Sequence, residues 1–309
     1  MSKNFSKQIR KIFSFTFLTG LLILIGFYLI SFPPNFLLES KVSKLNLPTP
    51  PAYPKNSSGI EPPVLTARSV VIIDVDSGVE LLQKDSKIST APASTTKIMT
   101  ALISLENYKL DHVLEVNGLK EIEGQKMKLV PNEKISVESL LYGLLVGSAN
   151  DAALVLAENF PNGEEGFIWA MNQKAKELNL TGTHFTNPVG YDEEGHYSTA
   201  SDLAKLAIFA MKNPEFSKIV GTEKMTIFDI EGKISHQLTN VNALVGKLDG
   251  VKGVKTGWTQ QAGECLITFI ERDRKRIVIA ILGSQDRFVE TQNLVNWVFT
   301  NFTWESPLY

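Results

Sequence analysis

Ser94 and Lys97, three residues apart, are the residue types in this chain whose spacing best suits covalent chemistry. A serine hydroxyl attacks a carbonyl only when a neighbouring base takes its proton, and residues three apart on a helix share a face. Lysine acts as that base when burial and a nearby positive charge favour its neutral form. The pair predicts acyl transfer, although a lone Ser-x-x-Lys is more often an ordinary helix start.

Two further strings follow in the chain and supply partners for this pair. At the joint between two apolar segments, we expect Ser148 to relay a proton to the leaving amine and Asn150 to donate to the substrate backbone. Simple helix capping is the alternative for both. On a strand edge, Lys255 and Thr256 would hold a substrate carboxylate, and Gly257 would let another backbone approach closely. Lys255 also supplies the second positive charge, and a plain polar loop is the alternative there.

The rest of the sequence argues against several other kinds of site. The four histidines lack the paired spacing of a zinc peptidase, and there is no Gly-rich phosphate loop or Gly-x-Ser-x-Gly elbow. We therefore expect no metal and no cofactor. A formal net charge of -2 without a long basic run gives no reason to expect nucleic acid. The single cysteine, Cys265, is expected to be a small buried hydrophobe.

Strand-like segments lie near both ends of the expected folded region, and helical periodicity fills its middle. A turn at 76–78 and a charged turn at 272–275 each predict a hairpin. The expected strands are 69–74, 79–83, 265–270 and 277–282. The expected helices are 95–106, 137–145, a segment that follows Asn150 and runs through Ala153 to Leu156, 167–178, 199–211 and 288–302. One sheet built from distant segments and covered by helices follows, which is an α+β fold.

The start of the chain is typical of a membrane segment. Residues 12–32 carry no charged side chain, follow a basic stretch at 1–11, and would span about 31 Å as a helix. A secretory signal normally has a shorter apolar core and a small-x-small cleavage site, and residues 30–34 make a poor one. We expect an uncleaved transmembrane signal anchor, with a cleaved signal as the alternative. Both place the remaining chain outside the cytoplasm, in the periplasm or on the outer face of the cell membrane.

Proline then marks a change of organisation. Residues 33–65 hold eight of the fourteen prolines, a composition that favours extended, solvated chain, and we interpret them as a linker. The catalytic domain is expected at 66–303, and residues 304–309 are expected to form a tail.

The flanks of the three strings carry a resemblance to a known family. The matching blocks are 93–101 (ASTTKIMTA), 140–153 (LLYGLLVGSANDAA), 187–191 (NPVGY), 196–204 (HYSTASDLA) and 248–266. Over roughly residues 66–300 the sequence resembles the D-alanyl-D-alanine carboxypeptidases of the low-molecular-mass penicillin-binding class, peptidase family S11.

This resemblance implies a β-lactamase-like fold, a mainly antiparallel sheet flanked by helices, and a role in the cell wall and cell shape. Ser94 would be acylated by the penultimate D-alanine of a peptidoglycan stem peptide ending in D-Ala-D-Ala, and Lys97 would accept its proton. Ser148 would continue the proton path. The backbone N–H groups of Ser94 and Trp258 would form the oxyanion hole, and β-lactams would acylate the same serine. The implied substrate-binding residues are Asn150, Lys255, Thr256 and Gly257.

Two further residues shape the expected pocket. The implied substrate ends in a free carboxylate, which a planar bidentate cation suits better than a point charge. Arg287 follows the strand 277–282 and opens the last predicted helix, so we expect it to lie beside the strand of Lys255 and contact that carboxylate. A surface ion pair is the alternative. Trp258 is bulky for its position and is expected to alter the pocket rim.

Three other functions compete with carboxypeptidase activity. A β-lactamase shares the motifs, but class A enzymes add a glutamate that positions the deacylating water, and residues 184–190 contain no carboxylate. Ala149 also stands where the usual set has Asp. A non-catalytic β-lactam or peptidoglycan sensor would keep the pocket without turnover, and the intact Ser94, Lys97 and Lys255 argue against it. A DD-endopeptidase or transpeptidase role stays open, because the acceptor depends on cleft shape.

Overall fold

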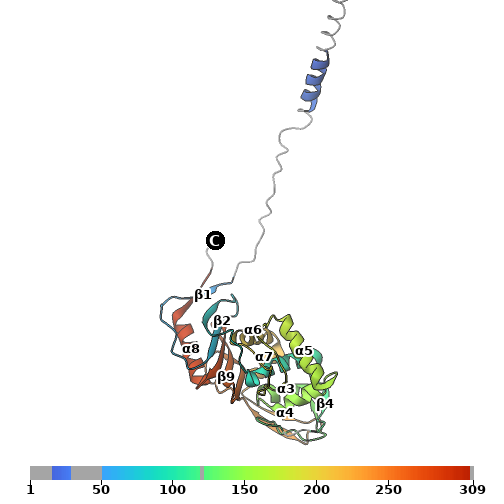
Figure 1. Cartoon of the computed structure of the whole chain (residues 1–309), viewed down its shortest axis with the longest axis vertical. Coiled ribbons are helices and arrows are strands. Elements are labelled where there is room, and N and C mark those ends of the chain that lie inside the picture. The colour runs from blue at the N-terminus through green and yellow to red at the C-terminus, as the bar shows by residue number, and fades with distance from the viewer. Residues whose placement is uncertain (1–15, 29–50, 119–121, 307–309) are drawn as a thin grey trace, which may run out of the picture. The chain divides into compact units, whose positions relative to one another are not determined.

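The computed structural model describes residues 16–28, 51–118 and 122–306 (Figure 1). Two compact units are present, Met1–Thr49 and Pro50–Tyr309, and residues 16–28 of the first form a helix. Among these described residues, no helix is both long enough and apolar enough to cross a membrane. The predicted membrane segment 12–32 extends past this helix at both ends, and those ends lie outside the described residues.

A five-stranded antiparallel sheet, in the order β3-β2-β10-β9-β8, forms the centre of the second unit. Its strands are β2 (Ser69–Asp74), β3 (Glu80–Lys84), β8 (Val251–Thr259), β9 (Gly263–Arg272) and β10 (Lys275–Ser284). The two predicted hairpins are confirmed as β2–β3 and β9–β10. Because the sheet joins the two ends of this unit, the expectation of one sheet built from distant segments is also confirmed.

Helices fill the region between the sheet segments, as predicted. They are η1 (Ala93–Thr96), a single 3-10 turn, α2 (Lys97–Asn107), α3 (Val137–Leu145), α4 (Asn150–Glu158), α5 (Gly163–Glu177), α6 (Ala200–Ala210), α7 (Pro214–Val220) and α8 (Arg287–Asn301). Side-chain caps fix several starts. Ser136 accepts from the Ser139 N–H before α3, and Asp286 accepts from the Val289 N–H before α8. Helix α7, begun by Asn213 and Pro214, was not predicted.

Both faces of the sheet are covered (Figure 1). Helix α6 packs on β10 and β2 on one side, and α8 packs on β9 and β10 on the other. In β10, Ile277, Ile279 and Ile281 belong to the core under α8, whereas Val278 and Leu282 belong to the larger helical core. Because successive side chains of β10 point into two different cores, its sequence is a continuous apolar run. Cys265 is fully buried, as predicted.

Three two-stranded ribbons complete the second unit, and none was predicted. They are β1 (Tyr53–Asn56) with β11 (Phe302–Glu305), β4 (Val113–Glu115) with β5 (Lys134–Ser136), and β6 (Lys224–Phe228) with β7 (Ser235–Thr239). The first ribbon corrects two domain boundaries. The folded unit includes residues 53–56, which we had assigned to the linker 33–65, and residues 304–305, which we had assigned to the tail. Pro54 is tolerated because β1 has a free outer side that needs no ladder bond.

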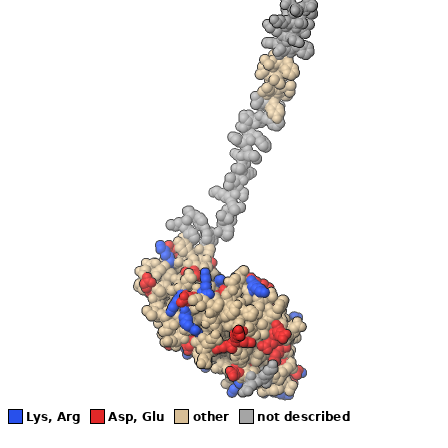
Figure 2. All heavy atoms as spheres, viewed as in Figure 1, with Lys and Arg blue, Asp and Glu red and all other residues tan. Residues whose placement is uncertain are grey.

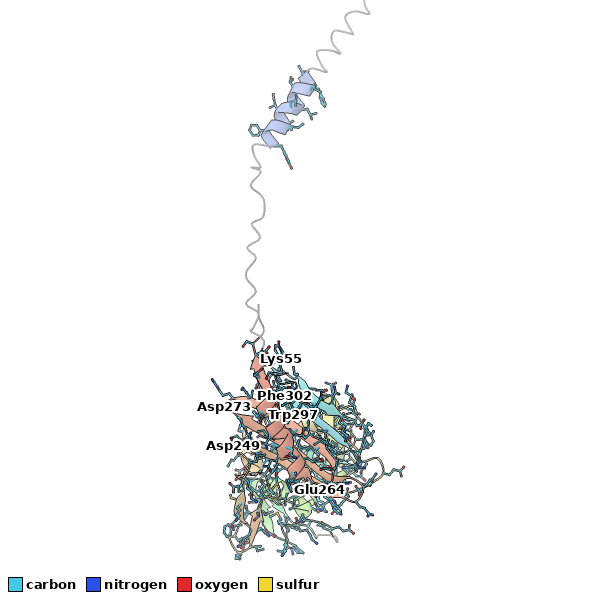
Figure 3. The ribbon with its side chains drawn as sticks, turned by 90° about the vertical axis from the view of Figure 1, so that its left-hand side faces the viewer. Lys55, Asp249, Glu264, Asp273, Trp297 and Phe302 are labelled. Atoms are coloured by element: carbon cyan, nitrogen blue, oxygen red, sulfur yellow. The ribbon has the colours of Figure 1, made fainter. Side chains whose placement is uncertain are left out.

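The β1–β11 ribbon and the end of the sheet that carries Glu264 lie apart. Figure 3 shows Lys55 and Phe302 at one end of the folded unit and Glu264 toward the other. Glu264 is the partner of Trp258 across β8 and β9. On the face shown in Figure 2, acidic and basic side chains both occur, rather than one sign of charge alone.

Candidate active site

Ser94 lies in the 3-10 turn η1, directly before α2. The preceding residue, Ala93, has a φ of 48°, a left-handed conformation that few residues other than glycine adopt. Two glycines press against this turn. A Cβ at Gly190 would lie 2.0 Å from the Ala93 carbonyl oxygen, and one at Gly257 would lie 2.9 Å from the Ser94 nitrogen. Only residues without a side chain let both segments approach the serine this closely.

Lys97 is the first residue of α2, and its side chain is fully buried. Its Nζ lies 2.9 Å from Ser94 Oγ and donates to the Val189 carbonyl at 2.8 Å. Burial, and next the positive charge of Lys255, hold the pKa of Lys97 well below its ordinary value, while the Asp151 carboxylate opposes this shift. The predicted serine–base contact is therefore present, with a lysine whose neutral form is accessible.

Lys255 on β8 forms a second lysine–serine contact. Its Nζ donates to Ser148 Oγ at 2.8 Å and to the Thr256 carbonyl at 2.9 Å. Burial, followed by the positive charge of Arg287, lowers the pKa of Lys255 to about 7. Ser148 itself has a φ of 57°, at the joint between α3 and α4. The second positive charge that the sequence predicted near Lys97 is thus supplied by Lys255.

Asn150 lies at the start of α4, but its side chain is oriented differently from our expectation. Its Nδ2 donates to the Glu123 carbonyl at 2.6 Å and lies 3.4 Å from the Tyr191 hydroxyl. Its Oδ1 is buried and has no hydrogen-bond partner. The amide N–H that we expected to donate to a substrate thus donates to the protein backbone in this structure.

Arg287 begins α8 and reaches β8 with its guanidinium. Its Nη1 donates to the Gly257 carbonyl at 2.7 Å, and its Nε is buried without a partner. Within the described part of the chain, no carboxylate lies within ion-pair distance of this guanidinium. The structure thus favours the predicted position beside β8 over the surface ion pair that was its alternative.

These residues meet at a cleft of about 920 Å³ between η1, α4 and the edge strand β8. The predicted residues that line it are Ser94, Ser148, Asn150, Thr256, Gly257, Trp258 and Arg287. Lys97 and Lys255 do not line it, since both are fully buried behind their serines. Trp258 is 63% exposed, as expected for a side chain on the rim. Among the residues that the structure describes, no group of three His, Cys, Asp or Glu side chains is arranged to hold a metal.

Two supporting residues escaped the sequence analysis. Asn187 Oδ1 accepts from the backbone N–H groups of Val189, Gly190 and Tyr191, and this turn presents the Val189 carbonyl to Lys97. His196 Nε2 lies 2.9 Å from the Thr96 hydroxyl, and burial lowers the pKa of His196 to about 4, so the ring is neutral near pH 7. Both residues belong to blocks that carried the family resemblance, but their types alone gave them no role.

Asp151 positions one wall of the cleft. Its fully buried carboxylate accepts the backbone N–H groups of Met127, Lys128 and Leu129 at 2.8–3.1 Å, in addition to that of its neighbour Ala152. The backbone N–H of Asn150 adds a bond of 2.7 Å to the Gln125 carbonyl. Together these bonds hold residues 122–130 against α4, where Glu123 and Gln125 line the cleft.

Known proteins share this sequence pattern. Residues 56–286 match the model of a family described as D-alanyl-D-alanine carboxypeptidase, peptidase S11. The D-alanyl-D-alanine carboxypeptidase DacF of Bacillus subtilis is 35% identical over 252 residues, which cover 79% of this chain and 64% of that protein. A D-alanyl-D-alanine endopeptidase of Pseudomonas aeruginosa is 29% identical over 243 residues, which cover 76% of this chain and 78% of that protein.

Known structures share the fold. The crystal structure of a Streptomyces DD-transpeptidase matches with a TM-score of 0.72 and 29% sequence identity, over 78% of this chain and all of that chain (100%). The predicted fold of DD-peptidases is therefore confirmed for the second unit. The match spans less than two thirds, 64%, of the length of the Bacillus relative.

Proposed function

This chain belongs to the D-alanyl-D-alanine carboxypeptidase family of serine peptidases, family S11, and on that premise we propose that it removes the terminal D-alanine from peptidoglycan stem peptides. The observation that carries the proposal is the contact of 2.9 Å between Ser94 Oγ and the fully buried Nζ of Lys97, at the floor of an open cleft. Such a contact activates a serine only where the lysine is neutral, and burial favours that form here.

Acylation follows from the positions of the two lysine–serine contacts. Neutral Lys97 takes the Ser94 proton as Oγ attacks the carbonyl carbon of the penultimate D-alanine. The Oγ–C bond forms, the C–N bond breaks, and a proton passes through Ser148 to the leaving amine. The backbone N–H groups of Ser94 and Trp258 are assigned to the oxyanion, because η1 and β8 pack together beside the cleft. Water then attacks the ester and restores Ser94.

Substrate binding is assigned to the polar groups of the cleft and its edge strand. Thr256 and Arg287 bind the terminal carboxylate, with the charge of Lys255 behind them. Gly257 lets Ser94 of η1 lie against β8. The outer side of β8, which is unpaired in the sheet, is left for the substrate backbone. Asn150 forms part of the cleft wall beside the substrate. β-Lactams, which present a strained amide and a carboxylate to the same groups, acylate Ser94.

A single experiment tests this function. The chain is incubated with a pentapeptide that ends in D-Ala-D-Ala, and free D-alanine is followed by mass spectrometry. We expect release by the native chain and none by Ser94→Ala. If the native chain released no D-alanine while penicillin still acylated Ser94, a non-catalytic sensor would replace the proposed enzyme. Rapid turnover of penicillin would instead indicate a β-lactamase.

An endopeptidase or transpeptidase activity is the second candidate, because an endopeptidase matches this chain in sequence and a transpeptidase matches it in fold. The acyl-enzyme on Ser94 would be the same, and only the leaving group or the acceptor would differ. Cross-linked muropeptides in the same assay separate these activities: cleavage of the cross-link indicates an endopeptidase, and new cross-linked product indicates a transpeptidase.

We propose further that residues 12–32 anchor the chain in the cell membrane with the folded unit outside the cytoplasm. The support is the uncharged run of 21 residues after a basic stretch. Protease added to intact spheroplasts should digest the folded unit of the native chain. A chain that starts at residue 51 should instead stay in the cytosol and be protected. Protection of the native chain would contradict the proposed orientation.

A further inference from the structure

Arg287 has to reach across a strand to act at the cleft. It begins α8, which follows β10, whereas the carbonyl that it binds belongs to Gly257 on the edge strand β8. The sheet order places β9 between these two strands. The guanidinium reaches β8 only if the start of α8 is held at one position over β9. The bonds at this helix start therefore decide where Arg287 meets a substrate.

Glu264 on β9 lies between the two strands that Arg287 joins. It pairs with Trp258 of β8 on one side and with Ser284 of β10 on the other. Its Oε2 accepts from the backbone N–H of Arg287 at 3.0 Å. This bond joins β9 directly to the residue whose side chain enters the cleft.

Other bonds at the same helix start come from the chain of α8 itself. The first N–H groups of a helix have no intrahelical partner. Here Ser284 Oγ accepts from the Asp286 N–H at 3.0 Å, and Asp286 Oδ1 accepts from the Val289 N–H at 3.1 Å. These two bonds stabilise the first turn, but they join it only to its own segment. The bond to Glu264 is the one of the three that ties the turn to β9.

The same bond leaves the guanidinium of Arg287 free. A carboxylate beside an arginine commonly forms a bidentate ion pair with it, and such a pair would occupy the donors that a substrate carboxylate needs. No ion pair within the described ranges joins Glu264 to Arg287. Glu264 binds the backbone N–H instead, and the buried Nε of Arg287 has no partner. The carboxylate thus holds the backbone of Arg287 and leaves its side chain available.

We propose that Glu264 is a positioning residue, which holds the start of α8 so that the Arg287 guanidinium meets the terminal carboxylate of the substrate. This inference rests on the proposed carboxypeptidase function and adds a residue to its binding of that carboxylate. Glu264 does not line the cleft, so it acts through Arg287. Because a small displacement of a binding group is enough to lower a rate, loss of the bond should reduce kcat/KM about 5- to 20-fold.

Two variants of equal charge test this role in the full chain in detergent. Glu264→Gln keeps an acceptor oxygen, whereas Glu264→Met has a similar length and no such oxygen. Each variant is given two pentapeptides, one that ends in D-Ala-D-Ala and one that ends in the corresponding terminal amide. The readout is the ratio of kcat/KM for the acid to that for the amide. We expect this ratio to fall about 5- to 20-fold in Glu264→Met and to stay within about 2-fold of the native ratio in Glu264→Gln.

A double-variant cycle shows whether Glu264 acts through Arg287. In an Arg287→Ala chain the guanidinium is gone, so adding Glu264→Met should leave the ratio unchanged, because effects that act through one contact do not add. Asn213→Ala is the control for a weakened helix start. Asn213 accepts from the N–H groups of Glu215 and Phe216 and does not line the cleft, so this variant should keep the native ratio.

The outcomes separate the inference from the function on which it rests. If Glu264→Met kept the native ratio, or slowed the hydrolysis of both peptides equally, the positioning role would be wrong while the carboxypeptidase activity stood. A further fall of the ratio in the Arg287→Ala chain would contradict action through Arg287. If the native chain released D-alanine from neither peptide, the function would fail as well. Melting temperatures show which variants fold, and Glu264→Asp, whose side chain is one carbon shorter, replaces Glu264→Met if that variant does not fold.

Discussion

At the scale of single residues, two buried lysines each reach a serine hydroxyl, Lys97 to Ser94 and Lys255 to Ser148. Burial is the largest cause of the lowered pKa in both, and like charge is the second. In the proposed mechanism the two lysines nevertheless have opposite tasks. Lys97 has to lose its proton to act as a base, whereas Lys255 has to keep its proton to donate to Ser148 and attract a carboxylate.

The opposite tasks predict a bell-shaped pH dependence of kcat/KM for a D-Ala-D-Ala peptide. The rate rises as Lys97 deprotonates, because only the neutral amine accepts the serine proton. It falls as pH passes about 7, where Lys255 loses its charge. Steady-state rates between pH 4 and 10 check this. A rate that stayed level up to the ordinary pKa of lysine would contradict the assigned role of Lys255.

Arg287 is expected to affect both substrate binding and the pH dependence of kcat/KM. Arg287→Ala should lower kcat/KM about 10- to 100-fold, the usual effect of losing hydrogen bonds to a charged group. It also removes the positive charge that helps to lower the pKa of Lys255, so the alkaline limb should move to higher pH. Arg287→Lys keeps the charge and loses the planar fork. It should therefore weaken binding and leave the limb close to the native position.

An unchanged rate in Arg287→Ala would remove Arg287 from the substrate-binding residues. A lowered rate with an unmoved alkaline limb would keep its contact with the carboxylate but contradict its influence on Lys255. The two readouts thus test two separate consequences of one side chain.

At the scale of elements, the cleft wall 122–130 is held from beneath by buried acidic groups. Asp151 accepts the three N–H groups of residues 127–129. A second tie comes from β7, where His236 Nδ1 lies 2.8 Å from the Met127 carbonyl and therefore donates to it. His236 Nε2 lies 2.7 Å from the buried Glu133. The wall has little regular structure, so these side chains determine its position.

Asp151→Asn should therefore act on both stability and the pH profile. One carboxamide oxygen replaces two carboxylate oxygens, and we expect the free energy of unfolding to fall by about 2–4 kcal/mol. The Asp151 charge raises the pKa of Lys97, so its removal should move the acid limb of kcat/KM to lower pH. Denaturant unfolding and the rate profile measure the two effects.

Asp202→Asn is the matched control for that variant. Asp202 is also buried and accepts from the Gly182 N–H at 2.8 Å and the Thr183 hydroxyl at 2.9 Å, but it does not line the cleft. It should lower stability without moving the acid limb. A shift of the limb in both variants would show that lost stability, rather than the charge of Asp151, causes it.

The same contacts explain what the sequence could and could not predict. Ser94 and Lys97 lie within one helical turn, so their separation along the chain is enough to bring them together. Apolar β-branched runs predicted the strands β2, β9 and β10 of the sheet. The cleft wall depends on bonds between residues 22–24 apart, such as Met127 to Asp151, which no periodicity reveals. The orientation of Asn150 follows from that wall. We predicted that the Asn150 amide donates to a substrate, whereas in this structure it donates to the Glu123 carbonyl of that wall.

At the scale of the whole folded unit, its first and last described segments are bonded together. β1 pairs with β11, the Ser57 N–H donates to the Asn301 carbonyl, and Trp297 Nε1 donates to the Ile60 carbonyl. These partners belong to α8 and its continuation, whereas Arg287 lies at the other end of α8, at the cleft. The sequence analysis missed this ribbon because the high proline content of residues 33–65 is also typical of linkers.

Removing the ribbon should cost stability and leave the chemistry intact. A chain that begins at residue 66 loses the β1–β11 pairing and leaves the Trp297 N–H without its partner. We therefore expect its free energy of unfolding to be about 2–5 kcal/mol lower than that of a chain that begins at residue 51. Urea unfolding of the two chains measures this difference. The rate of D-alanine release at 25 °C should be the same for both, because none of residues 51–65 lines the cleft. If the two chains were equally stable, residue 66 would again be the start of the folded unit. If the short chain were fully folded but released D-alanine more slowly, the β1–β11 end of α8 would control the position of Arg287.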